Sequence, residues 1–223
     1  RCAALIAPFA SALVDKRAYT IVKIASSLDG RIATRTGASR FITGPGARAV
    51  VHRLRDAVDA VVVGAGTVLA EDPSLTVRDV PSSNPRRVVV DRHHRTHAGA
   101  TVYTRHIGEP APLVFSTNPV TFAEHVPFVD LRAMLEHLAT LNTTAALVEA
   151  GPGLATAFLQ AGLVDELWWF TAPLLLGADG APAIGALELE ELAGAPRFSV
   201  EHRVDVGGDA LTILRPARAL PIE

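Results

Sequence analysis

Short runs of aliphatic residues recur along the chain, and each one stops at a glycine, a hydroxyl residue or an acid. They lie at residues 20–25, 61–63, 87–91, 112–117 and 145–148. Runs that are mostly apolar, without polar alternation, are typical of strands buried on both faces of a largely parallel sheet. A longer apolar run starts at Leu167 and is interrupted at Pro173. It is too short to span a membrane and predicts a further buried strand.

Between these runs, hydrophobic residues recur at the spacing of an amphipathic helix. In residues 45–58 they form one stripe, which consists of Ala47, Val51, Leu54 and Val58. Thr43 stands in the N-cap position of this helix. Residues 131–141 repeat the pattern, and a glycine-rich turn at residues 151–153 opens a helix that we expect to reach Gln160.

The end of the chain has a different pattern. Residues 197–206 and 210–215 alternate between apolar and polar positions on either side of Gly207-Gly208-Asp209. This pattern predicts an antiparallel hairpin with a glycine turn. Strands that alternate with helices and then end in a hairpin indicate one α/β domain, with a mixed sheet flanked by helices.

Composition narrows the function classes. The chain has 223 residues and a net charge of −2, so it lacks the basic footprint of a nucleic-acid-binding protein, and no apolar run is long enough for a membrane helix. Its one cysteine, Cys2, excludes an internal disulfide and a cysteine-based zinc cage, and a cytoplasmic location fits. The three close histidines at 93, 94 and 97 fit a polar loop better than a metal site.

Chemistry-bearing side chains gather where the expected strands end. Thr67, Glu71 and Arg78 follow the strand at 61–63, and Glu149 ends the strand at 145–148. Such residues meet at the carboxyl edge of an open α/β sheet, where ligands bind. A solvated loop with a helix cap is the plainer interpretation of the segment after residue 63. Lys23, inside its strand, either has a partner, reaches a cleft or extends to water at a sheet edge.

Neither glycine turn carries the standard dinucleotide fingerprint, because Leu69 and Thr156 stand where a third glycine is required. The turn at residues 151–153 still opens a helix. Free N–H groups and the positive end of the helix dipole make such a start a natural phosphate seat.

Four segments, taken in order, resemble one enzyme family. They are K-x-A-x-S-L-D-G-R-x-A at 23–33, G-x-S-x-x-I-T-G at 37–44, T-V-L-A-x-D-P-x-L-T-V-R at 67–78 and V-E-A-G-P-x-L at 148–154. This series is similar to the reductase domain of riboflavin biosynthesis, the 5-amino-6-(5-phosphoribosylamino)uracil reductase half of a bifunctional pyrimidine deaminase–reductase. The resemblance implies a dihydrofolate reductase-like fold, NADPH as cofactor, a homodimer and a zinc deaminase as the fused partner domain. Residues 1–19 would then be a connector, 20–217 the reductase domain and 218–223 a tail.

The resemblance also implies roles for individual residues. The substrate would be lined by Ser39, Arg55, Leu75, Arg78 and Glu149. The cofactor would be lined by Ala25, Phe41, Thr67, Glu71, Gly151, Pro152, Gly153, Leu154, Ala155, Thr156 and Ala157. Two guanidiniums, those of Arg55 and Arg78, suit a ribose 5-phosphate dianion.

The implied reaction transfers a hydride from NADPH to C1′ of the ribose and opens the sugar to a ribityl chain. It needs a proton donor, for which Lys23, Asp29 and Glu149 are the alternatives. Asp29 is as well explained as the cap of its own turn.

The chain departs from the family pattern at four positions. Relatives often carry Glu at the position of Ala38, Trp at Phe41, Asp at Glu71 and a small hydroxyl residue at Arg92. Arg92 either pairs with the 2′-phosphate of NADPH or is exposed. Two other functions stay open, namely a pterin or folate reductase of the same fold and a non-catalytic nucleotide-binding domain.

Overall fold

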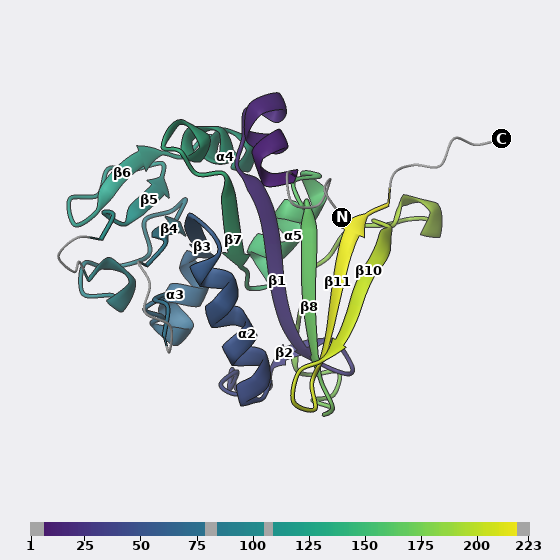
Figure 1. Ribbon diagram of the computed structural model, residues 1–223. Coiled ribbons are helices and arrows are strands. Elements are labelled where there is room, and N and C mark those ends of the chain that lie inside the picture. The colour runs from purple at the N-terminus through teal and green to yellow at the C-terminus, as the bar shows by residue number, and fades with distance from the viewer. Residues whose placement is uncertain (1–6, 79–83, 105–108, 218–223) are drawn as a thin grey trace.

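A nine-stranded sheet forms the centre of the molecule in this computed structural model, which describes residues 7–78, 84–104 and 109–217 (Figure 1). Its strands in chain order are β1 (Tyr19–Ser27), β3 (Ala60–Gly64), β4 (Arg86–Val90), β5 (Leu113–Ser116), β6 (Glu124–Pro127), β7 (Ala145–Glu149), β8 (Glu166–Ala172), β10 (Phe198–Asp205) and β11 (Ala210–Pro216). A separate two-stranded sheet pairs β2 (Arg31–Ala33) with β9 (Ala181–Pro182).

The helices connect these strands and cover the sheet. The α-helices are α2 (Pro45–Asp56), α3 (Ala65–Glu71), α4 (Leu131–Thr140) and α5 (Pro152–Gln160). Short π and 3-10 segments are η1 (Ser11–Asp15), η2 (Thr101–Tyr103) and η3 (Leu192–Gly194).

The order of the strands is β10-β11-β8-β1-β7-β3-β4-β5-β6. All neighbours from β8 to β6 run parallel, whereas β11 pairs antiparallel with both β8 and β10. The sheet is therefore mixed and ends in the expected hairpin. Within it, β1 and β7 are in register so that Lys23 lies opposite Glu149. This pairing brings together two charged residues that are 126 positions apart in the chain (149 − 23).

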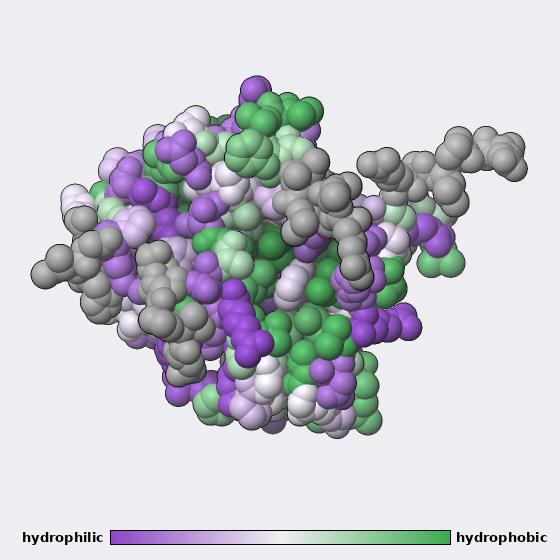
Figure 2. Space-filling model, in the orientation of Figure 1, coloured by the Kyte–Doolittle hydropathy of each residue, from purple (hydrophilic) through white to green (hydrophobic). Residues whose placement is uncertain are grey.

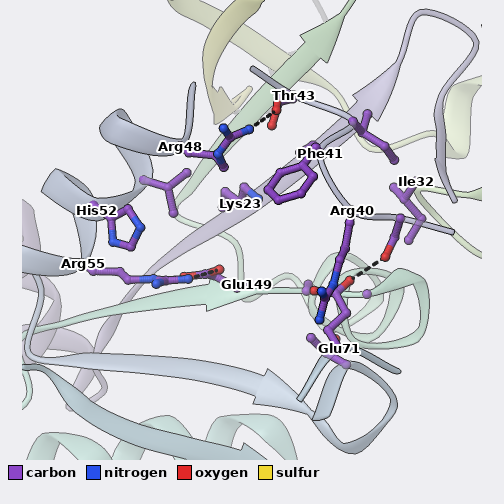
Figure 3. A pocket seen from close by; sticks show the side chains of 17 residues that line it. Lys23, Ile32, Arg40, Phe41, Thr43, Arg48, His52, Arg55, Glu71 and Glu149 are labelled. Atoms are coloured by element: carbon purple, nitrogen blue, oxygen red, sulfur yellow. Dashed lines mark hydrogen bonds and ion pairs between the residues drawn. The ribbon is translucent and has the colours of Figure 1, made fainter. Parts of the chain in front are cut away.

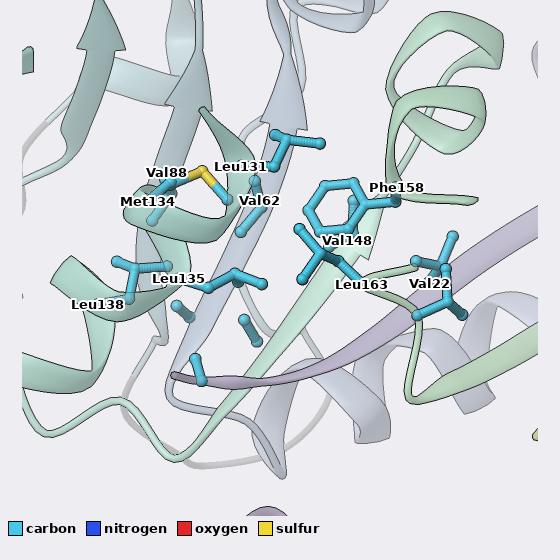
Figure 4. Packing of buried hydrophobic residues seen from close by; sticks show 14 of the residues in the cluster. Val22, Val62, Val88, Leu131, Met134, Leu135, Leu138, Val148, Phe158 and Leu163 are labelled. Atoms are coloured by element: carbon cyan, nitrogen blue, oxygen red, sulfur yellow. The ribbon is translucent and has the colours of Figure 1, made fainter. Parts of the chain in front are cut away.

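Alternate residues of the central strands pack on opposite faces. Val62 of β3 and Val148 of β7 contact one cluster with α4 and α5, where Leu135 and Phe158 are fully buried (Figure 4). Val61 belongs to the cluster on the other face, with residues from α2 and α3. The continuous apolar strand runs of the sequence thus reflect burial on two faces.

A third, smaller cluster joins α2 to the antiparallel end of the sheet. Ala47 and Val51 of α2 pack there against Phe170 of β8 and Leu211 of β11. α2 crosses one face of the sheet beside β1, and no helix covers β11 and β10 on that side in Figure 1. Hydrophobic residues gather on this face over β1, β8 and β11 in Figure 2.

Several expectations from the sequence differ from the fold. The strands β1 and β3, which precede and follow α2 in the chain, run parallel but are not neighbours in the sheet, because β7 lies between them. The N-cap of α2 is Gly44, not Thr43, and it has no side-chain cap. The helix α3 begins directly after β3 and has no side-chain cap, where a solvated loop with a helix cap was the plainer interpretation.

Some expectations fall outside the described residues. Residues 1–6 of the connector, with Cys2, and the tail at 218–223 are among them. In the part of the chain that the structure describes, no helix combines the length and apolarity needed to cross a membrane.

Candidate active site

A pocket of about 320 Å³ opens between the carboxyl side of the central strands, the inner face of α2 and the loop before α2 (Figure 3). Its lining carries both charges and apolar walls. It consists of Lys23, Ala25, Ile32, Ser39, Arg40, Phe41, Ile42, Thr43, Arg48, Val51, His52, Arg55, Thr67, Glu71, Glu149, Ala150 and Gly151. Nine of the residues that the sequence predicted for substrate, cofactor or catalysis are in this list: Lys23, Ala25, Ser39, Phe41, Arg55, Thr67, Glu71, Glu149 and Gly151.

Lys23 reaches this pocket from the middle of β1. It and Ala25 are the two partly exposed positions in a strand that is otherwise buried, and they are two residues apart. Residues with that spacing point to the same face of a strand. The sequence alternatives for Lys23 are thus decided in favour of the cleft, and its ammonium lies 6.0 Å from the ring centre of Phe170.

Glu149 binds Arg55 through two parallel hydrogen bonds. Nε of Arg55 donates to Oε1 at 2.5 Å and Nη2 donates to Oε2 at 2.9 Å. The third arm, Nη1, donates to the carbonyl oxygen of Thr76 at 2.9 Å. The side chains of Arg55 and Glu149 are only 12% and 14% exposed, so the pair is largely shielded from water.

This geometry sets the charges of the pocket. Burial alone would raise the pKa of Glu149, but the charge and hydrogen bonds of Arg55, with smaller contributions from Lys23 and His52, hold that pKa below its ordinary value. Burial lowers the pKa of Lys23, and the charge of Arg55 lowers it further against the opposing effect of Glu149. The pocket therefore holds a carboxylate at neutral pH, and beside it a lysine that gives up its proton more readily than an ordinary lysine does.

The loop at residues 39–43 forms one wall of the pocket. Oγ of Ser39 donates to Oε1 of Glu71 at 3.1 Å, which ties the loop to α3. Phe41 has a φ of 63° and is 74% exposed, and the guanidinium carbon of Arg48 lies 4.8 Å from the centre of its ring. A left-handed aromatic residue is uncommon and is often found at a functional site.

The helix starts of α3 and α5 lie side by side at the edge of the pocket. A Cβ on Gly151 would meet Thr67 Oγ1 at 3.4 Å, and one on Gly64 would meet Leu154 at 3.7 Å. Neither helix has a side-chain cap, and the space around Gly153 is open. Uncapped N–H groups beside open space suit a phosphate, so the residues present fit a dinucleotide cofactor.

The side chains at the start of α5 are not available to bind a phosphate. Ala155 and Thr156 are buried, and Thr156 Oγ1 instead donates to the carbonyl of Pro152 and accepts from the N–H of Gly185. Any contact of this segment with a cofactor phosphate therefore comes from the backbone.

Nine expected site residues are not in the pocket lining: six of them follow Gly151 at the start of α5, and the other three are Asp29, Leu75 and Arg78. Asp29 is exposed, accepts from Ser27 Oγ and holds the backbone N–H groups of Leu176 and Gly177. The hydrogen bond from Ser27 lowers its pKa to about 2, so Asp29 is a carboxylate that anchors a loop. Leu75 points into the core at 2% exposure, with a φ of 56°.

Arg78 is exposed and donates to Ser74 Oγ at 3.1 Å. Ser74 shares a hydrogen bond with Thr76, whose carbonyl accepts from Arg55. The expected pair of guanidiniums therefore flanks one turn, but the fork of Arg55 faces Glu149 where a phosphate was expected.

Sequence reasoning missed three cationic or titratable residues of the lining, namely Arg40, Arg48 and His52. Arg48, His52 and Arg55 are spaced by four and three residues, which places them on one face of α2. That spacing was visible in the sequence, but nothing there tells a pocket-facing stripe from a solvated one. The residues His93, His94 and His97 do not belong to any metal-binding cluster of three among the described residues.

Comparisons with known proteins place these features in context. The family model of the RibD C-terminal domain matches residues 18–211. The chain is 36% identical to the riboflavin biosynthesis protein RibD of Escherichia coli K12, over 86% of this chain and 58% of that protein. It is 35% identical to the 2,5-diamino-6-ribosylamino-4(3H)-pyrimidinone 5′-phosphate reductase of Methanothermobacter thermautotrophicus, over 87% of this chain and 96% of that protein.

Solved structures agree with this similarity. Acinetobacter baumannii RibD superposes with a TM-score of 0.88 at 31% identity, over 97% of this chain and 63% of that one. A dihydrofolate reductase from Enterococcus faecalis matches with a TM-score of 0.54 at 12% identity, which shows a shared fold only. The expected dihydrofolate reductase-like fold is thus confirmed. The chain spans less than two thirds of the length of the RibD proteins it matches, as the coverages of 58% and 63% show.

Proposed function

The chain belongs to the RibD C-terminal domain family, and from this premise we propose that it is the NADPH-dependent reductase of 5-amino-6-(5-phosphoribosylamino)uracil in riboflavin biosynthesis. The observation that carries the proposal is the set of Lys23, Arg55 and Glu149 in one pocket at the carboxyl edge of the sheet. When bound, NADPH supplies a hydride to C1′ of the ribose.

Glu149 and Arg55 orient the substrate. Glu149 is a carboxylate at neutral pH and accepts hydrogen bonds from ribose hydroxyls or from amino groups of the pyrimidine. Arg55 keeps this carboxylate ionised and in one orientation, and three of its five N–H donors are already used. The phosphate is bound by the remaining donors of Arg55, by the hydroxyl of Ser39 once it turns away from Glu71, and by the exposed Arg78 turning toward it. Leu75 supports the turn between the two arginines from the core side.

Lys23 is the proton donor in this proposal. Opening the ribose ring requires a proton at the ring oxygen as its bond to C1′ breaks, and the carbon–nitrogen double bond left at C1′ then accepts the hydride. A donor works best when its pKa lies near the working pH. Burial shifts the pKa of Lys23 downward, toward the working pH, whereas Glu149 and Asp29 both have lowered pKa values and hold no proton to give at neutral pH.

The cofactor lies on the other side of the pocket. Ala25, Phe41 and Thr67 provide a wall for the nicotinamide half, and Glu71 holds Ser39 beside it. In the segment from Gly151 to Ala157, the backbone N–H groups ahead of Ala155 are offered to a phosphate, because Pro152 has no N–H and the N–H of Ala155 donates to the carbonyl oxygen of Gly151 at 3.0 Å. The side chain of Arg92 is exposed, which leaves it accessible to a 2′-phosphate.

The test is an assay of NADPH oxidation with the purified protein. Both the deaminated pyrimidine and its 2-amino precursor are offered, because the archaeal relative is named for the second. We expect loss of the nicotinamide absorbance with a phosphoribosylaminopyrimidine and none with dihydrofolate. Turnover of dihydrofolate would favour the pterin reductase, and NADPH binding without oxidation would favour a non-catalytic domain.

The assembly is a homodimer in this proposal. The face of β8, β10 and β11 beside α2 has partly buried apolar residues, among them Trp168 and Ile213, and no helix over β11 and β10 (Figures 1 and 2). An isologous contact would cover it. Light scattering should give twice the mass of one chain. We further propose a cytoplasmic location and a fused zinc deaminase domain in the full-length protein, which cell fractionation and the sequence of the intact gene would test.

A further inference from the structure

Arg48 makes two contacts with the loop at residues 39–43. Its Nη1 donates to the carbonyl oxygen of Thr43 at 2.7 Å. Its guanidinium carbon lies 4.8 Å from the centre of the Phe41 ring, as a cation over an aromatic face. Figure 3 shows both partners beside Arg48 at the pocket. One arginine therefore holds a backbone group and a side chain of the same wall.

This wall needs an outside support. Phe41 combines a left-handed backbone with a ring that is 74% exposed, so its own packing does not fix it. Such a conformation persists only where the surroundings over-determine it. The described side-chain contacts elsewhere in the loop are at its two ends, where Ser39 binds Glu71 and the N–H of Gly44 binds Asp209.

The base from which Arg48 extends is itself firmly placed. The N–H of Gly44, the N-cap of α2, donates to the buried carboxylate of Asp209 at 2.6 Å. Gly46 lies against the turn of the C-terminal hairpin, where a Cβ would come within 2.2 Å of the Val206 carbonyl oxygen. The hairpin thus fixes the start of α2. Because Arg48 extends from this fixed part of the helix, its contacts hold the loop in a defined place relative to α2.

We infer that Arg48 is a positioning residue that holds Phe41 as a preformed wall of the pocket and thereby strengthens binding of NADPH. The inference rests on the proposed function, in which Phe41 lines the cofactor. Without Arg48 the loop samples other conformations, and the cofactor must order it on binding. The affinity falls by the fraction of molecules in the competent conformation. A residue that instead contacted the substrate phosphate directly would affect the affinity for substrate and leave the loop unchanged.

The experiment compares Arg48→Ala, Arg48→Lys and Phe41→Leu with wild type, with Arg53→Ala as control because Arg53 is exposed on the same helix. Hydrogen exchange of the peptide that covers residues 39–43 is followed without ligand, and NADPH affinity is measured by calorimetry. For Arg48→Ala we expect faster exchange in that peptide and roughly tenfold weaker NADPH binding, about 1.4 kcal/mol. Arg48→Lys should lie between, since an ammonium retains a donor but not the planar stack.

The double variant Phe41→Leu/Arg48→Ala shows whether Arg48 affects NADPH binding through Phe41 or independently of it. If Arg48 acts through Phe41, the double variant binds NADPH about as weakly as the weaker single variant. Unchanged exchange and affinity in Arg48→Ala, with thermal unfolding showing that it is folded, would overturn the inference. A rise in substrate KM alone would also overturn it and assign Arg48 to the substrate. Wild type that binds NADPH without oxidising it would refute the proposed function only, because exchange and affinity still decide the role of Arg48.

Discussion

Replacing Arg55 by methionine tests the centre of the pocket most severely. Glu149 would stay in its largely buried place but lose both hydrogen bonds of the fork. Removing one partner of a buried ion pair costs roughly 3–5 kcal/mol, because the other charge stays buried and uncompensated. Lys23 remains opposite Glu149 in the register, so we expect the lower end, about 3 kcal/mol.

Urea unfolding followed by the fluorescence of Trp168 and Trp169 measures this loss. With a slope of roughly 2 kcal/mol per molar urea, the midpoint should fall by about 1.5 M. The matched control is Arg53→Met, which removes an exposed arginine from the same helix and should change stability by no more than about 0.5 kcal/mol. The double variant Arg55→Met/Glu149→Gln removes the uncompensated charge and should recover much of the loss.

The loss should also depend on pH. The pKa of Glu149 is lower in the folded protein than its ordinary value of 4.5, so the ion pair contributes stability above pH 4.5. That contribution disappears as the pH falls through the folded-state pKa. Wild type and Arg55→Met should therefore converge toward acid. Equal stability of Arg55→Met and Arg53→Met at pH 7, or a difference that grows toward acid, would refute this reasoning.

Two further predictions concern Lys23 and Gly46. Burial disfavours the charge of Lys23, so Lys23→Met should unfold at the same urea concentration as wild type or at a higher one. Any gain in stability over wild type should shrink as the pH rises toward 10.5, where Lys23 loses its charge in the unfolded chain as well. The kcat of the same variant should fall at least about a hundredfold. A variant that is both less stable and fully active would contradict both parts. Gly46→Ala should cost about 2 kcal/mol because its Cβ would meet the backbone of Val206, whereas Gly66→Ala, with open space around it, should be neutral or better in thermal unfolding.

Much of the fold could be predicted because local pattern and burial agree. Strands such as β3 and β7 are continuous apolar runs in the sequence and are buried on both faces. The glycines Gly207 and Gly208 between two alternating segments predicted the C-terminal hairpin. The order of the strands was not predictable, because β7 enters between β1 and β3 through contacts remote in sequence. The helix α3 was missed because Gly64 and Gly66, at its start, are typical of a loop.

The sequence predicted several of the residues that line the pocket, but not how their side chains pair with one another. Lys23 and Glu149 were expected at one cleft, and the register of β1 with β7 puts them opposite each other. The partner of Arg55 could not be foreseen, since a guanidinium fits a phosphate and a carboxylate equally well. Local turn geometry determines where the other two expected residues lie. Asp29 accepts hydrogen bonds from two backbone N–H groups, and the side chain of Leu75 points into the core.

The most direct test of the account follows the hydride itself. NADPH deuterated at the transferred position of the nicotinamide is incubated with the protein and the phosphoribosylaminopyrimidine, and the product is analysed by NMR and mass spectrometry. We expect one deuterium at C1′ of a ribityl product with wild type, and none with Lys23→Met. Deuterium elsewhere in the product, or an intact ribose after NADPH has been consumed, would contradict it.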